Sequence, residues 1–125
     1  SLIVAHERLD GNGVRGFQTP LATLHAFQGW ADVFLTTPAR GLTDVSATAA
    51  YTWAEPPVGR RWVLSASWRE FTDADGDLDF GSEFDAAAQV TINDHWTLEA
   101  KMAAFEGAGI FADRDKAWLS LEYRF

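Results

Sequence analysis

The sequence lacks cysteine and is poor in basic residues, and each absence removes a class of function. Without cysteine, the 125-residue chain can form no disulfide bridge, zinc–thiolate site or thiol nucleophile. Ten Lys and Arg stand against 18 Asp and Glu, which gives a formal net charge of −8. A nucleic-acid-binding face needs clustered Lys and Arg, so we expect no nucleic-acid partner. No apolar run approaches the roughly 20 residues that a membrane-spanning helix requires.

The chain also lacks an evident catalytic or metal-binding set. The three histidines share no ligand spacing, and no nucleophile is paired with a base. They are His6, His25 and His95. We therefore expect no cofactor and no resident metal, and an enzyme built on this fold is only a third hypothesis.

One acidic segment is similar to a calcium-binding loop without matching it. The stretch DADGDLD (73–79) has Asp at its first, third and fifth positions, as an EF-hand loop does. However, Gly76 falls at the fourth position instead of the sixth, and Phe84 stands at the twelfth. The segment predicts a solvated acidic turn, with weak divalent-cation binding as the alternative.

What the sequence has in abundance is alternation of apolar and polar residues. In HWTLEAKMAAF (95–105), Trp96 and Leu98 share one face, while Glu99 and Lys101 share the other. A period of two predicts β-strands rather than helices. The same pattern recurs in the ranges 43–53, 61–71, 82–93 and 116–125, and a sixth strand is predicted over 2–9.

The connections between these segments alternate in length. The stretches 55–60 and 93–95 are short and rich in Pro, Gly, Asn and Asp, whereas 10–41, 73–80 and 107–114 are longer. Short turns at one end and long loops at the other are typical of an antiparallel up-and-down transmembrane β-barrel. We expect about six strands of a larger barrel, because six strands do not close one of this kind, and we treat 1–125 as its C-terminal part.

Aromatic residues gather on the apolar faces at the strand ends beside the short turns. They are Trp53, Trp62, Trp96, Tyr123 and Phe125. A row of aromatic side chains at one level predicts the girdle of a membrane–water interface. The alternative is a soluble small β-barrel that binds a hydrophobic ligand. In that alternative, the face carrying Leu64, Ala86, Leu98 and Leu121 would be the interior.

The long connection 10–41 departs from the period of two. Its apolar residues recur every three or four positions, which predicts short helical turns after a cap at Thr19 and Pro20. This loop either folds inward and narrows a pore or packs its own apolar side chains outside. The candidate pore-constricting residues are Arg15, Gln18, His25, Gln28 and Asp32.

Two long stretches resemble a known family. GFQTPLATLHAFQGWADVFLTTPARGL (16–42) is similar to a motif of the alginate-export-like outer-membrane porins of Gram-negative bacteria. The stretch 81–125, ending DKAWLSLEYRF, resembles the two C-terminal hairpins of that family. The resemblance implies a β-barrel in the bacterial outer membrane, in contact with its lipid, that passes small solutes or an anionic polysaccharide. It also implies that Phe125 is a sorting signal for the barrel assembly machinery.

The polar faces of the strands give the predicted lining of the lumen. These residues are Asp44, Arg69, Glu83, Asp85, Glu99, Lys101, Lys116, Glu122 and Arg124. Four are basic and five are acidic, whereas a path for a polyanion favours Lys and Arg. The mixture leaves open a general or differently selective porin instead of an alginate-selective one.

Overall fold

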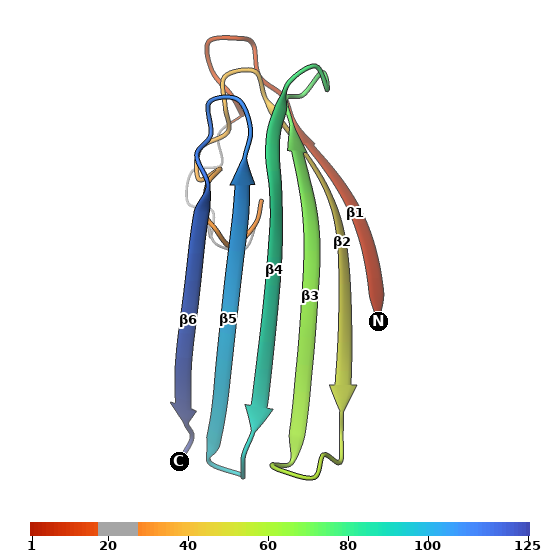
Figure 1. The fold of residues 1–125 in the computed structure, drawn as a ribbon, viewed down its shortest axis with the longest axis vertical. Helices are drawn as coiled ribbons and strands as arrows, with labels where there is room; N and C mark the ends of the chain where they lie inside the picture. The colour runs from red at the N-terminus through yellow and green to blue at the C-terminus, as the bar shows by residue number, and fades with distance from the viewer. Residues whose placement is uncertain (18–27) are drawn as a thin grey trace.

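The protein is built on one antiparallel sheet of six strands, seen in a computed structural model that describes residues 1–17 and 28–125 (Figure 1). Each strand pairs with the next one along the chain. The strands are β1 Leu2–Leu9, β2 Leu42–Trp53, β3 Arg61–Thr72, β4 Asp79–Thr91, β5 Trp96–Gly107 and β6 Arg114–Tyr123. The predicted all-β, up-and-down order is confirmed. The sheet is open, because β1 and β6 form its two edges.

Short polar turns fix the register at one end of the sheet. Between β4 and β5, the Asn93 side-chain oxygen accepts hydrogen bonds from the backbone N–H groups of His95 and Trp96, at 2.9 and 3.0 Å. This is the local bonding that favours Asn in tight turns. Because side chains alternate between faces, the pairing of Thr91 with Thr97 that follows sets which residues of β5 share a face with β4.

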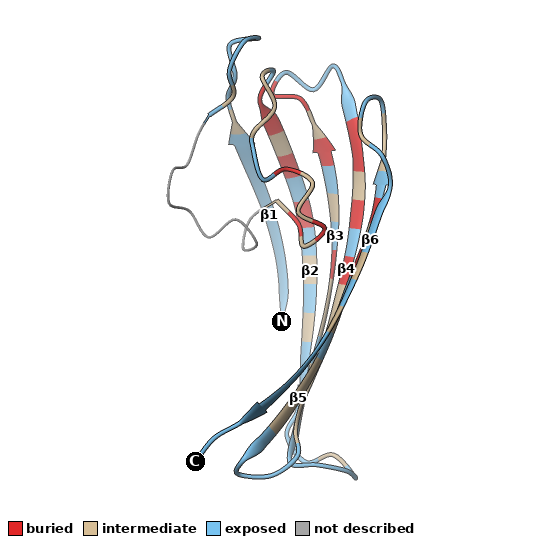
Figure 2. Ribbon diagram, turned by 90° about the vertical axis from the view of Figure 1, so that its left-hand side faces the viewer, coloured by how far each residue is buried: buried red, intermediate tan, exposed pale blue. Residues whose placement is uncertain are grey.

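The long connections lie at the opposite end of the sheet, and part of the first one turns back along a face of it (Figure 2). The helix predicted over this connection is wrong for its described part, residues 28–41, which consist of turns and bends. Positive φ angles at Gln28 (51°), Gly29 (87°) and Asp32 (55°) are incompatible with a right-handed helix. The predicted cap at Thr19 and Pro20 lies outside the described residues. Across the part of the chain that is described, no helix is long and apolar enough to cross a membrane.

An aromatic cluster forms the core at the long-loop end. Phe34, from the first connection, packs against Phe71 with ring centroids 4.6 Å apart and against Phe105 at 5.8 Å. Phe80 and Phe111 complete the cluster at 6.1 and 5.0 Å from Phe34. Buried residues gather in this half of the sheet, as the red segments of Figure 2 show, and the short-turn half holds exposed or half-buried residues.

Candidate functional site

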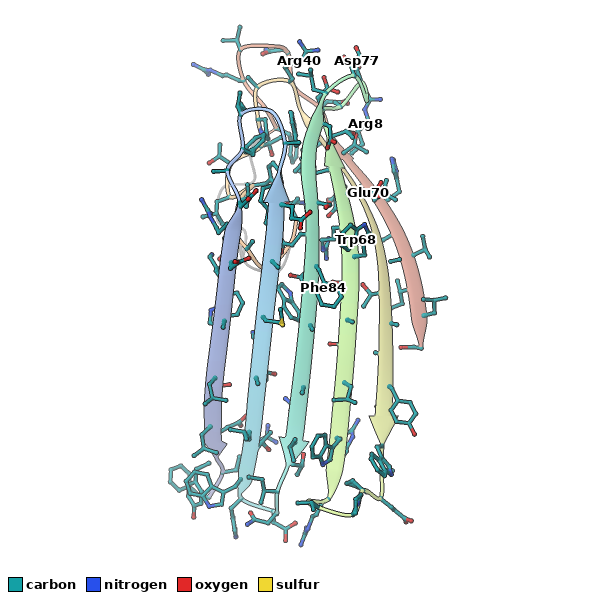
Figure 3. All side chains as sticks on the ribbon, viewed as in Figure 1. Arg8, Arg40, Trp68, Glu70, Asp77 and Phe84 are labelled. Carbon is teal, nitrogen blue, oxygen red and sulfur yellow. The ribbon has the colours of Figure 1, made fainter. Side chains whose placement is uncertain are left out.

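The sheet has two chemically different faces, which we name by the first connection. The inner face is the one covered by residues 28–41, and the outer face is the opposite one. Large apolar side chains on the outer face are exposed, and Figure 3 views this face with Trp68 and Phe84 on paired positions of β3 and β4. They include Val45, Tyr51, Leu64, Trp68, Phe84, Met102, Leu119 and Leu121.

The predicted lumen-lining residues all fall on the inner face. The alternation of each strand and the register of the sheet place them there together with Ser46, Ser67 and Ala103. Arg124, just beyond β6, is placed by the same alternation and by its contact with Glu122. Three of these acids are almost completely buried. Asp44, Glu83 and Asp85 have exposed fractions of 4%, 0% and 1%. Burial of this extent requires partners, because an isolated buried charge is costly.

Arg69 supplies a partner to two of the three acids. One of its terminal nitrogens lies 2.5 Å from Asp44 Oδ2, and its Nε lies 3.7 Å from Asp85 Oδ2. Ser67 Oγ donates a further hydrogen bond of 3.2 Å to Asp85 Oδ2. One guanidinium thus bridges acids on β2 and β4 across β3. Within the described residues, Asp44 Oδ1 and Asp85 Oδ1 still have no hydrogen-bond partner.

Glu83 and Lys116 contact the first connection instead of a neighbouring strand. The backbone N–H of Ala31 donates a hydrogen bond of 2.8 Å to Glu83 Oε1. Lys116 Nζ lies 2.6 Å from Asp32 Oδ2. Arg114, which sequence reasoning missed, donates to the backbone oxygen of Asp32 at 2.8 Å. The inner face and the turn around Ala31 and Asp32 therefore form one polar network.

The candidate constricting residues separate into three groups. Gln28 and Asp32 contact strands of the sheet. Gln28 Nε2 donates to Glu7 Oε2 on β1 at 2.6 Å, and Asp32 pairs with Lys116 on β6. Arg15 is exposed on the outlying part of the loop. Gln18 and His25 lie outside the described residues.

The remaining predicted lumen residues lie nearer the short turns. Lys101 Nζ is 3.6 Å from Glu99 Oε1, and Arg124 Nε is 2.6 Å from Glu122 Oε1. Lys101 also lies over the ring of Trp30, with its nitrogen 5.5 Å from the ring centroid. Trp30 was not among the predicted site residues. It directly precedes Ala31 and Asp32, which contact Glu83 and Lys116 on the inner face.

The five girdle residues share the short-turn end of the sheet. Trp53 pairs with Trp62 across β2 and β3, and Trp96 pairs with Tyr123 across β5 and β6. The rings of Trp96 and Tyr123 are 4.8 Å apart, and Phe125 lies 5.5 Å beyond Tyr123. These rings form an aromatic row of two groups, with β4 between them, and its membrane role stays a prediction.

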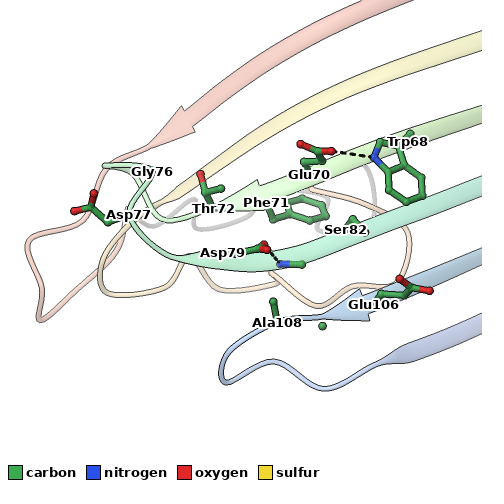
Figure 4. Close-up of a pocket in the computed structure, with 12 residues that line it drawn as sticks. Trp68, Glu70, Phe71, Thr72, Gly76, Asp77, Asp79, Ser82, Glu106 and Ala108 are labelled. Atoms are coloured by element: carbon green, nitrogen blue, oxygen red, sulfur yellow. Dashed lines mark hydrogen bonds between the residues drawn. The ribbon is translucent and has the colours of Figure 1, made fainter.

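A shallow groove of about 600 Å³ marks the other end of the outer face (Figure 4). Glu70 pairs with Ser82, and Ser82 pairs with Glu106, so a polar row crosses β3, β4 and β5. Trp68 Nε1 donates to Glu70 Oε1 at 3.5 Å just below this row. Among the described residues, no group of three or more His or acidic side chains is arranged to hold a metal ion.

The acidic turn after β3 is organised by Asp73, whose side chain is completely buried. Asp73 Oδ1 accepts hydrogen bonds from the backbone N–H groups of Asp77 and Leu78, at 2.8 and 3.2 Å. Arg40 Nε lies 3.1 Å from Asp73 Oδ2. Burial disfavours the ionised carboxylate, but the hydrogen bonds from Leu78, Arg40 and Asp77 outweigh it and lower the pKa of Asp73. This carboxylate caps the turn.

Comparisons of the chain with known protein families, with curated proteins and with solved structures find no match. The resemblance to the alginate-export-like porins therefore rests on the two sequence stretches alone.

Proposed function

We propose that this chain forms part of the wall of an outer-membrane porin, with its outer face against lipid and its inner face along the path of the permeating solute. The observation that carries the proposal is the distribution of side chains between the two faces. Apolar side chains such as Leu119 and Leu121 are 76% and 59% exposed, whereas acids such as Glu83 and Asp85 are buried. In water this arrangement is unfavourable, but in a membrane the exposed apolar face is buried by lipid.

The height of the apolar band supports the proposal. On β3 the outer face is uncharged from Trp62 to Trp68, and the polar row begins at Glu70. The eight residue steps from Trp62 to Glu70 span about 26 Å along the strand at ~3.3 Å per residue. Strands of outer-membrane barrels tilt by about 35–45°, so this length corresponds to a height of roughly 20 Å, slightly less than the about 25 Å of a typical apolar band. The distance between the aromatic row at one end and the polar row at the other is thus close to the distance between two membrane interfaces.

The open sheet requires further strands in this proposal. Unpaired backbone groups along β1 and β6 are not tolerated in lipid, so these edges pair with other strands of the same barrel. The permeant is a small polar solute. Passage of an anionic polysaccharide is the finer expectation from the family resemblance. The soluble alternative is less favoured, because residues 28–41 cover the opposite face from the one it would bury.

A test is to compare neighbouring positions on the two faces. Single cysteines replacing Leu98 and Thr97, in a chain that has no other cysteine, are labelled with a fluorophore after reconstitution into vesicles. Brominated lipids are expected to quench the label at Leu98→Cys strongly and the label at Thr97→Cys weakly. Equal quenching, or a protein that stays in buffer as a compact monomer without detergent, contradicts the proposal.

A further inference from the structure

The carboxylate of Glu83 is enclosed by the first connection. Its side chain is fully buried, and Oε1 accepts the hydrogen bond from Ala31, a residue 52 positions away in the sequence. A Cβ added to Gly29 would come within 2.5 Å of Glu83 Oε2. The turn therefore sits on the carboxyl group so closely that a methyl group at position 29 would fit only if the Glu83 side chain shifted.

The backbone of this turn is shaped to receive an acid. Gln28, Gly29 and Asp32 all adopt left-handed φ angles, which are uncommon for residues other than glycine. Mixing left- and right-handed residues turns successive N–H groups toward one side and makes a concave site for an anion. Here the group in that site is the side-chain carboxyl of Glu83, part of the protein itself. The contact compensates the strain of two non-glycine residues in this region.

The other side of the same turn faces bases. The backbone oxygens of Ala31 and Asp32 accept hydrogen bonds from Arg114, at 3.4 and 2.8 Å, and the Asp32 carboxylate pairs with Lys116. Glu83 on β4 is paired with Phe105 on β5, which is paired with Arg114 on β6. The turn thus spans three strands on one row of the sheet, with N–H groups toward the acid and oxygens toward the bases.

We propose that Glu83 is a positioning residue that fixes the turn 29–32 across the inner face and thereby sets the bore of the channel. This inference rests on the proposed porin function for its consequence, but the position of the turn can be tested without any transport measurement. Glu83 acts on the permeant only through the turn that it holds.

The first experiment measures hydrogen exchange of the amides of residues 29–34 in the purified, detergent-solubilised full chain. Glu83→Ala removes the acceptor, and we expect exchange of this segment to rise about tenfold or more, as leaving the buried N–H of Ala31 without its partner implies. Glu83→Gln keeps an oxygen in the same place and is expected to restore protection close to the parent level. Glu122→Ala, which removes an inner-face carboxylate at the short-turn end, is expected to leave the segment unchanged. Unchanged exchange in Glu83→Ala, or an equal rise throughout β3, β4 and β5, overturns the proposal.

A second variant approaches the contact from the turn and leaves Glu83 intact. Gly29→Ala places a methyl group against the carboxylate and is expected to raise exchange of residues 30–34 as Glu83→Ala does. Gly13→Ala is the matched control, since Gly13 has a similar φ of 81° but nothing within 4 Å of the added Cβ. If both glycine variants behave alike, backbone strain and not the Glu83 contact holds the turn, and the proposal fails.

Single-channel conductance in planar bilayers, measured on the closed barrel that contains this chain, then separates the two proposals. Larger conductance in Glu83→Ala and Gly29→Ala, with parent-like values in Glu83→Gln and Gly13→Ala, supports both. If the conductance is the same in all four variants, the contact between Glu83 and the turn still stands, but the proposal that this contact sets the bore is overturned. A parent protein that forms no channel contradicts the porin function, while the exchange data still decide whether Glu83 holds the turn.

Discussion

The two ends of the sheet are built in different ways. At the long-loop end, residues 28–41 and the tops of the strands enclose five phenylalanines and a network of buried charges. At the short-turn end, the strands carry exposed or half-buried side chains on both faces. The first end resembles a small protein core, whereas the second holds, among the described residues, no cluster of buried side chains. The comparison teaches that this fold separates a part stabilised by its own packing from a part whose side chains stay accessible on both faces.

The largest effect is expected from the aromatic cluster. Phe71 is completely buried against Phe34 and Phe105, so Phe71→Ala leaves a cavity and is expected to lower the free energy of unfolding by about 4 kcal/mol. Phe84→Ala, on the exposed outer face, is the control and is expected to cost much less. Denaturant unfolding in detergent micelles measures both. Equal losses would mean that the long-loop end has no core of its own.

The next effect is expected from the buried ion network. Arg69→Met removes the cation between Asp44 and Asp85 and leaves two buried acids unpaired, at an expected cost of about 3 kcal/mol. The triple variant Arg69→Met, Asp44→Asn and Asp85→Asn is expected to recover part of this loss. The same unfolding experiment applies. No recovery in the triple variant would show that the Arg69 side chain stabilises by packing and not by charge.

A slightly smaller effect is expected in the middle of the outer face, which lipid covers in the proposed porin. Ala66 lies midway between Trp62 and Glu70 on the outer face. Ala66→Arg is expected to destabilise the protein by about 2–3 kcal/mol in lipid vesicles. Ser65→Arg, one residue away on the inner face, is expected to be nearly neutral. Reversible folding into vesicles compares them, and similar values for the two variants would break the assignment of the faces.

A local, pH-dependent effect is expected at the turn after β3. The pKa of Asp73 is lower in the folded chain than its ordinary value, so its contribution to stability is complete above the unfolded pKa of about 4 and is lost as pH falls through the folded pKa. Protection factors of the Asp77 and Leu78 amides, corrected for intrinsic exchange, are expected to drop at acidic pH. Asp73→Asn is expected to abolish this dependence. A drop that persists in Asp73→Asn would assign it to another group.

The smallest effect is expected from an exposed ion pair at the short-turn end of the sheet. Arg60 and Asp94 form an ion pair across the short turns, and both side chains are more than half exposed. Such surface pairs contribute about 0–1 kcal/mol, so Arg60→Ala is expected to change unfolding by less than about 0.5 kcal/mol. A loss as large as that of Arg69→Met would contradict the contrast between the two ends.

The sheet could be predicted from the sequence because each strand and each short turn is encoded by residues that are close together in the chain. Alternation of apolar and polar residues reveals each strand, and the short turns fix which face is shared, so Asp44, Arg69 and Glu83 are correctly grouped. The turn at 28–32 is different. Its contacts join residues 21 to 84 positions apart, and no periodicity encodes them. Apolar spacing predicted a helix there, but contact with Glu83 and the bases of β6 overrides that preference.

Phe71 and Phe105 could have been recognised in advance. Both interrupt the polar side of their strands at the end that precedes a long loop, where a solvated inner face has no need of phenylalanine. Such an exception to a regular pattern indicates that something covers the position. Which segment covers it, here Phe34, depends on the path of a long connection and could not be read from the alternation.

The open sheet also constrains any structure that completes it. Each of the five pairings is antiparallel, so β1 and β6 run in opposite directions. A closed barrel in which all neighbours remain antiparallel must therefore receive an even number of additional strands between these two edges. An odd number would force one parallel pair. Any closed, fully antiparallel barrel that contains these six strands therefore has an even number of strands in total.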